Sequence, residues 1–149
     1  PGLYGYVSAT KWVTDLKVTT FADDQGYWTP RGWSERGPVK TESRIDVPRS
    51  GERVSAGKVA LAGIAWAQHR GVKAVEVRVD DGPWQPARLA EEPTIDSWRQ
   101  WVLPWQAVRG NHTITVRATD AKGVVQTMTQ APPAPDGATG WHTITVNVD

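Results

Sequence analysis

The stretch AVEVRVDDGPWQPARL, residues 74–89, decides the class of fold. Val75, Val77 and Val79 alternate with charged residues, and a period of two places the three valines on one face of a β-strand. The Asp81-Gly82 dipeptide that follows supplies the chemistry of a tight turn. The stretch therefore predicts a half-buried strand that ends in a turn.

Similar patterns occur on both sides of this stretch. Apolar residues alternate at Ile114, Val116 and Ala118, and again at Ile144, Val146 and Val148. Further strands are predicted for residues 43–47, 58–67, 98–105 and 124–130, with Pro104 ending or edging its strand and residues 58–67 apolar almost throughout. No helical pattern is convincing. About seven strands between residues 52 and 149 are typical of an immunoglobulin-like β-sandwich, so we expect an all-β fold.

Residues 1–44 do not fit a self-contained sandwich. Thr10–Phe21 is rich in Val, Thr and Trp and predicts one strand, and residues 22–38 predict a long loop rich in Gly, Pro and Asp. The chain begins Pro1-Gly2-Leu3 without an initiator methionine. We therefore expect residues 1–44 to be the remnant of a preceding domain and residues 45–149 to be a second domain.

Composition and motifs argue against several functions. The net charge of +1 and the absence of long charge runs give no overall field for nucleic acid or a membrane surface. The chain has no cysteine, no apolar run long enough to span a membrane, and three well-separated histidines. The paired carboxylates fall in turns, and no nucleophile elbow or phosphate-binding loop occurs. We therefore assign no catalytic residue and no metal ligand within the chain.

Nine tryptophans stand against one phenylalanine and three tyrosines. Trp66 is predicted to lie in the core, and Trp84 to cover the hairpin next to it. Trp98, Trp101 and Trp105 do not share a strict period of two, so they cannot all face one core from a regular strand. We interpret them as aromatic anchors of an interface, with an ordinary core or a ligand platform as alternatives.

Lys11 is the remaining candidate for a binding role. It precedes Trp12 in YGYVSATKWV, residues 4–13. Taken alone, it is either a solvated lysine at the start of a strand or a contact to a phosphate or cofactor, a role that a flexible point charge suits.

The order of these motifs resembles one family. YGYVSATKWV, GYWTPRGW and KTESRIDVPRSGERV, followed by VALAGIAWA, WRQWVLPW and GATGWHTITVNV, are similar to the sulfite-oxidase-like molybdenum enzymes. The resemblance covers the end of the molybdopterin-binding domain and the C-terminal dimerisation domain. It implies an α/β cofactor domain upstream, a homodimer, and molybdopterin contacts from Ala9, Thr10 and Lys11.

The chain also departs from this family. The family holds molybdenum through a cysteine, so the ligand is expected upstream and no cofactor is expected to bind this fragment tightly. Trp33 falls at or next to the position of the family's active-site tyrosine, which argues against sulfite as the substrate. We expect an inactive C-terminal fragment of a bacterial-type oxidoreductase. The sequence does not assign the location of the parent protein, and a periplasmic parent and a membrane-anchored parent with an exported domain are both open. The alternative is a free-standing immunoglobulin-like module that binds carbohydrate.

Overall fold

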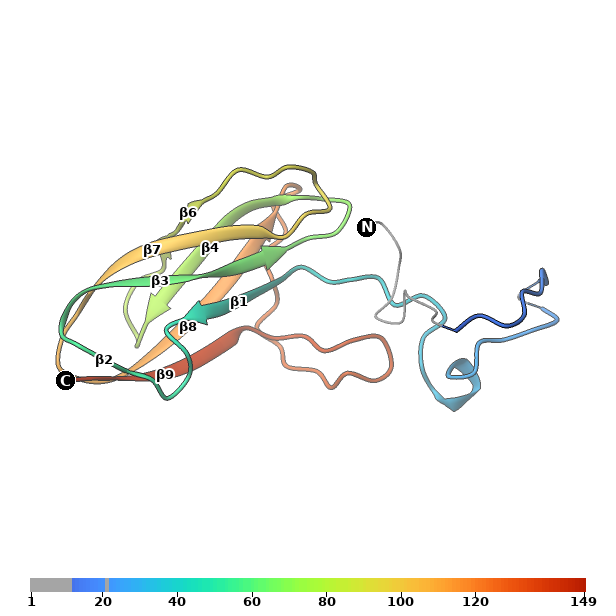
Figure 1. Cartoon of the computed structure of the whole chain (residues 1–149), viewed down its shortest axis with the longest axis horizontal. Helices are drawn as coiled ribbons and strands as arrows, with labels where there is room; N and C mark the ends of the chain where they lie inside the picture. The colour runs from blue at the N-terminus through green and yellow to red at the C-terminus, as the bar shows by residue number, and fades with distance from the viewer. Residues whose placement is uncertain (1–11, 21) are drawn as a thin grey trace.

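The structure, a computed structural model, describes residues 12–20 and 22–149 as two β-sheets packed face to face (Figure 1). The four-stranded sheet has the order β1 (Glu42–Val47), β3 (Gly57–Trp66), β7 (Arg99–Ala107) and β6 (Arg88–Leu89). The five-stranded sheet has the order β2 (Arg53–Val54), β9 (His142–Val148), β8 (Gly110–Asp120), β4 (Val72–Val79) and β5 (Gln85–Pro86). The described residues contain one short 3-10 helix, η1 (Thr29–Arg31), and no α-helix. The predicted all-β sandwich is confirmed.

The core lies between the two sheets and is built from alternating residues of the long strands. In β8, Ile114, Val116 and Ala118 are fully buried, as the alternation predicted. The other core residues follow the same period of two in their own strands, and they include Leu61, Ala65, Val75, Val77, Ile144, Val146 and Val148. Each inward strand position removes an apolar side chain from water, and this burial is the main force that holds the sheets together.

Two of the three proposed aromatic anchors belong to this core. Trp101 is 2% exposed and Trp105 is 9% exposed, and both point inward from β7 with a spacing of four residues. Trp98 precedes β7 and is 51% exposed. The mixed spacing arises because Trp98 is outside the strand, so the interpretation of Trp101 and Trp105 as interface anchors is wrong.

Trp66 is also placed differently from the prediction. It is the last residue of β3 and follows the buried Ala65, so it faces away from the core and is half-buried. Its indole Nε1 donates a hydrogen bond to the Asp96 carbonyl at 3.0 Å. The apolar run of residues 58–67 therefore has one face in the core and one apolar face on the outside of the sheet.

Pro104 lies within β7 and pairs with Ala60 of β3. On its other side, β7 is paired with β6 at Val102 and Trp101 only. Proline has no N–H to donate to a neighbouring strand. It is tolerated at this position because β7 has no second neighbouring strand there. The strand therefore does not end at Pro104, and the prediction holds only in that Pro104 lies on the unpaired side of β7.

Two predicted strands do not form. Residues 124–130 make only an isolated bridge between Val125 and Thr119, and Gln126 is buried there instead. The described part of the Thr10–Phe21 strand, residues 12–20, has no strand partner. A strand requires a neighbouring backbone to satisfy its N–H and C=O groups, and this segment extends away from both sheets.

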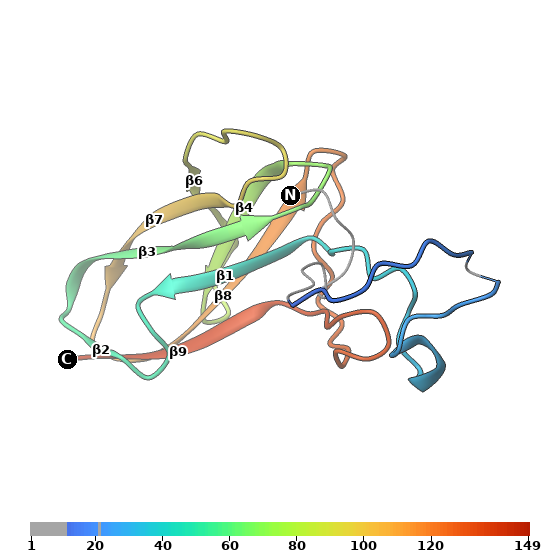
Figure 2. The same cartoon turned by 45° about the vertical axis from the view of Figure 1, so that its right-hand side comes forward.

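Residues 12–35 leave the sandwich at the end where β1 begins, as the blue segment in Figures 1 and 2 shows. The Ser34 N–H donates a hydrogen bond to the Pro135 carbonyl and so ties the segment to the sandwich. Just beyond it, Lys40 forms an ion pair with Asp136 at 3.1 Å. No helix within the described residues is long and apolar enough to cross a membrane.

Candidate functional site

The predicted cofactor contacts Ala9, Thr10 and Lys11 lie outside the described residues. The description begins at Trp12, the residue directly after them. The assignment of a cofactor role to these three residues therefore stays a prediction.

The donors for a metal site are missing from the part of the chain that the structure describes. No group of three or more His, Cys, Asp or Glu side chains gathers there, and the whole chain has no cysteine. Molybdenum in the family that the sequence resembles is held by a thiolate. The residues present do not fit a molybdenum centre of that kind.

His112 makes a polar contact through each ring nitrogen. Nδ1 donates to Asp80 Oδ2 and Nε2 donates to the Val108 carbonyl, both at 2.8 Å. Because both partners are acceptors, the ring fits this site as an imidazolium with a proton on each nitrogen. The hydrogen bond that His112 donates to Asp80 is the main cause of the raised pKa of His112. The pKa of Asp80 is held below its usual value, mainly by the hydrogen bond from the Thr113 N–H and secondly by the hydrogen bond from His112.

His142 differs from His112 in that one of its ring nitrogens accepts a hydrogen bond. Its Nδ1 accepts a hydrogen bond from the Ile45 N–H at 3.0 Å, so this nitrogen must carry no proton. Burial lowers the pKa of His142, and the nearby Arg44 guanidinium acts in the same direction against the opposing effect of Asp46. The two histidines are therefore structural groups at strand positions whose hydrogen bonds and pKa shifts have opposite directions.

An arginine–tryptophan cluster, formed by Arg78, Trp84, Arg117 and Trp141, covers the outer face of the five-stranded sheet. Trp84 and Trp141 meet edge to face at 5.1 Å between ring centroids. The Arg117 guanidinium lies 4.2 Å from the Trp84 ring centroid and the Arg78 guanidinium lies 5.0 Å from it. The two guanidinium groups lie over the aromatic rings, on the surface against which a sugar would have to stack. The expectation that Trp84 covers its hairpin is consistent with this position.

A second aromatic pair lies outside the other sheet. The Trp66 and Trp98 ring centroids are 5.7 Å apart with the rings inclined at 33°. The Arg44 guanidinium lies 5.8 Å from the Trp98 ring centroid. Glu42 beside this pair has a pKa raised by burial. Trp98 is thus the one predicted anchor that is available for an interface.

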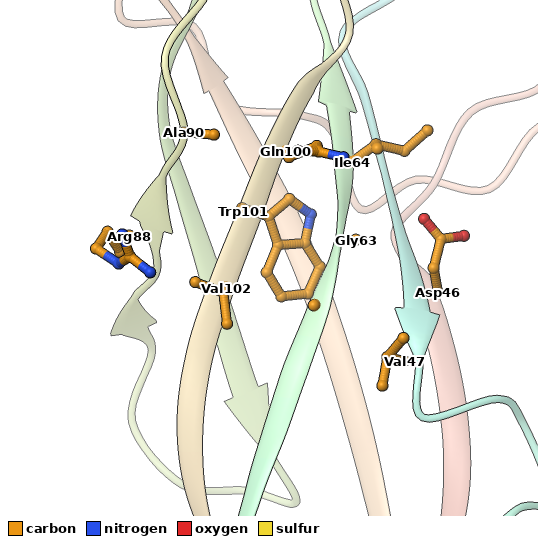
Figure 3. Close-up of a pocket in the computed structure, with 10 residues that line it drawn as sticks. Asp46, Val47, Gly63, Ile64, Arg88, Ala90, Gln100, Trp101 and Val102 are labelled. Carbon is orange, nitrogen blue, oxygen red and sulfur yellow. The ribbon is translucent and has the colours of Figure 1, made fainter.

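An open groove runs over the outer face of the four-stranded sheet next to this pair. Its lining includes Asp46 on one side and Arg88 on the other, with Ala62, Ile64 and Val102 among the residues between them. Figure 3 shows Asp46 and Arg88 on opposite sides of the groove, with Val102 and Trp101 between them. We call this surface the four-stranded face, defined by the outward residues of β1, β3, β7 and β6.

Two buried polar residues escaped the sequence reasoning. Asp120 is fully buried, and its Oδ1 accepts hydrogen bonds from the Lys122 and Val124 N–H groups. Arg70 Nε lies 3.3 Å from its other oxygen. Gln126 accepts hydrogen bonds from the Ser43 hydroxyl and the Ala118 N–H. Asp and Gln in polar turn sequences carry no signal of burial, because such residues are usually solvated and the strands that cover them are distant in the sequence.

None of the known protein-family models matches the chain. Human mitochondrial sulfite oxidase is 37% identical over 102 residues, which is 63% of this chain and 19% of that protein. The sulfite oxidase of Macaca fascicularis gives the same figures.

The sequence of the chain resembles part of the sulfite-oxidase-like enzymes. It spans about a fifth of the length of these curated relatives. The sulfane dehydrogenase SoxCD from Paracoccus pantotrophus has the same fold over 75% of this chain and 33% of that one, with a TM-score of 0.62 and 23% identity. The resemblance to sulfite-oxidase-like enzymes that the sequence motifs indicated is thus confirmed by the sequence identity. The structure of SoxCD shows in addition that the fold is the same.

Proposed function

We propose that this chain is the C-terminal part of a larger molybdopterin-dependent oxidoreductase. In this proposal residues 1–44 complete the preceding cofactor domain, and residues 45–149 form a dimerisation sandwich. The sandwich closes one side of the cofactor domain and supplies contact surface for a second copy. It has no redox activity of its own, because the metal ligand belongs to another part of the parent.

The observation that carries the proposal is the exposure of apolar side chains before the sandwich. Trp12, Leu16 and Val18 are 93%, 86% and 95% exposed, and Tyr27 and Trp28 are more than half exposed. A segment with this apolar content gains free energy when it is covered by other protein surface. The homology to a short part of a much longer sulfite oxidase is consistent with such a cover.

Lys11 is the proposed contact to the cofactor, together with the backbone of Ala9 and Thr10. A lysine ammonium pairs well with a phosphate as a point charge. When bound in the parent, the molybdenum cofactor would supply oxo-transfer or related redox chemistry. Trp33, which packs edge to face on Trp28 with 6.4 Å between ring centroids, falls at or next to the position of the family tyrosine. We therefore leave sulfite out of the proposal.

Elemental analysis of the full-length parent tests the class of protein. About one molybdenum atom per chain in a matured sample supports the proposal. A matured parent without molybdenum contradicts it and favours the free-standing binding module.

Hydrogen exchange tests the proposed boundary between the two domains. In the 149-residue chain we expect fast exchange of the amides of residues 12–20 and slow exchange in β3 and β8. In the parent, the amides of residues 12–20 are expected to become protected. Equal fast exchange in both proteins would contradict the assignment of this segment to the preceding domain.

A further inference from the structure

Arg78 is the member of the arginine–tryptophan cluster whose charge has no counter-ion among the described residues. It projects outward from β4, because the neighbouring Val77 is fully buried and side chains alternate along a strand. No carboxylate within residues 12–20 and 22–149 forms an ion pair with it. Its Nε is buried and has no hydrogen-bond acceptor in the same part of the chain. A buried donor without an acceptor is costly, so an acceptor that binds beside Arg78 lowers the free energy of the cluster.

The two carboxylates on either side of Arg78 along β4 are already engaged. Glu76 Oε2 lies 2.9 Å from Arg117 Nε and 2.8 Å from Arg117 Nη2. Asp80 is bound through both oxygens, one to a backbone N–H and the other to His112. Two arginines therefore face one glutamate within the cluster, and the charge in excess is positive.

The two tryptophans restrain both guanidinium groups. Arg78 lies 5.0 Å from the Trp84 ring centroid and 6.0 Å from that of Trp141. Arg117 lies 4.2 Å and 5.9 Å from the same two centroids. Trp141 is itself held, because its Nε1 donates a hydrogen bond to the Gln126 carbonyl at 2.8 Å. Arginine loses much rotamer entropy when it binds a ligand, and this restraint reduces that loss.

The donors of this site suit an oxyanion. A planar guanidinium presents parallel N–H groups that match two oxygens of a phosphate group. Thr115 lies opposite Arg78 in the β4–β8 ladder, and its hydroxyl is 3.1 Å from that of Thr143. One of the two hydroxyl protons lies between the oxygens, and the other can be donated to a ligand.

We propose that the arginine–tryptophan cluster binds a phosphate group, with Arg78 as its main ligand and Arg117 as the second. The group is either free inorganic phosphate or a phosphate monoester of a small molecule. The site lies within the sandwich, so it depends neither on the proposed cofactor domain nor on dimerisation. Because the site is open to water and salt, we expect a dissociation constant in the millimolar range.

A nuclear magnetic resonance titration of the isotope-labelled 149-residue chain tests the site. Inorganic phosphate or methyl phosphate replaces chloride at constant ionic strength, so that general screening of charges does not change. We expect saturable shifts of the Arg78 Nε–H signal and of the Trp84 indole N–H signal. Tighter binding of inorganic phosphate supports the free ion as the ligand, and tighter binding of methyl phosphate supports a monoester.

Substitutions around the site have different expected effects. Arg78→Gln should weaken phosphate binding about tenfold or more. Arg78→Lys keeps the charge without the paired donors and should weaken binding less than Arg78→Gln does. Glu76→Gln removes the carboxylate that engages Arg117 and should tighten binding. Arg88→Gln is the matched control, because Arg88 is an exposed arginine of the four-stranded face without an ion pair to the described residues, and binding should stay within about twofold of the wild type.

Circular dichroism checks that each variant is folded. If Arg78→Gln does not fold, Arg78→Lys and Glu76→Gln still test the proposal, since they must shift the dissociation constant in opposite directions.

Three results overturn the inference. The first is the absence of a saturable shift at Arg78 up to about 0.1 M phosphate, a concentration that saturates a site of millimolar affinity. The second is a dissociation constant that neither Arg78→Gln nor Arg78→Lys changes, which places the binding elsewhere. The third is equally tight binding of acetate, which overturns phosphate as the class of ligand.

Discussion

Gly63 is the position where the structure leaves least room for a side chain. A Cβ built there would lie 1.9 Å from the Arg44 carbonyl oxygen and 2.9 Å from Cζ2 of Trp101, whereas real Cβ atoms essentially never come within 3.0 Å of such atoms. The obstacle is the backbone of β1, which is paired with β3 at Gly63. We therefore expect Gly63→Ala to force β1 away from β3 by more than ~1 Å, because a backbone atom has no rotamer to change.

The cost can be worked from this geometry. Overpacking a core costs about 1–3 kcal/mol, and a displaced β1 also weakens ladder hydrogen bonds that are worth about 1 kcal/mol each. We expect Gly63→Ala to lower the free energy of unfolding by about 3–4 kcal/mol. For a sandwich of this size that loss corresponds to a melting temperature lower by roughly 10–20 °C.

Urea unfolding followed by tryptophan fluorescence is the assay, with two glycines as graded controls. At Gly82 the nearest atom to an added Cβ is the Val79 carbonyl oxygen at 3.0 Å, and at Gly26 it is the Thr29 hydroxyl at 3.6 Å. Gly82→Ala should be mildly destabilising, and Gly26→Ala should leave the unfolding midpoint unchanged. A loss below about 1 kcal/mol at Gly63, the size of an average substitution, would refute the argument.

The remaining predictions concern buried and titrating polar groups. The pKa of His112 is raised above its usual 6.5, so its stabilising contribution is complete below pH 6.5 and is lost as the pH rises through the raised value. We expect His112→Gln to cost about 1 kcal/mol at pH 5.5 and progressively less at higher pH, measured by urea unfolding from pH 5 to 9; a cost that does not change with pH would contradict this. The pKa of His142 is lowered, so its contribution is present above pH 6.5 and is lost as the pH falls through the lowered value. The same titration of His142→Gln should therefore show a cost that grows with pH, the opposite slope to His112→Gln. Asp120→Ala leaves two N–H groups and Arg70 without their buried partner, and we expect a loss of about 3–5 kcal/mol in thermal unfolding. Asp120→Asn keeps an acceptor for both N–H groups and should cost clearly less, and equal losses for the two variants would argue against these hydrogen bonds.

The sandwich itself could be predicted because the pattern that identifies each strand lies within a few consecutive residues. A period of two in β4, β8 and β9 identifies the buried faces without knowledge of the partner strands. The valines and isoleucines predicted to face inward are buried, except Val79, which is half-buried against the core. The tryptophans were harder, because burial depends on where each strand begins. Trp98 and Trp101 differ in environment since β7 starts at Arg99, and the sequence does not mark that boundary.

The candidate interaction surface could be predicted only in part. The apolar run of residues 58–67 predicted the composition of β3, but its outer face is open because no element within residues 12–20 and 22–149 covers it. The position of Asp46 and Arg88 on the two sides of one groove depends on strand order, which brings together residues more than 40 positions apart. Spacing along the sequence cannot reveal such a groove.

The ends of the two sheets have a consequence for storage and for assembly. Among the described strands, β2, β5 and β6 are only two residues long, β1 carries a bulge and is followed by Pro48, and Pro104 interrupts the open side of β7. An unprotected outer strand is a template on which further molecules add by backbone hydrogen bonding and grow into fibrils. Each border of this sandwich is too short, too kinked or too poor in donors to serve as such a template. Concentrated preparations of the sandwich should therefore resist fibril growth, and its assembly should be limited to contacts between side chains.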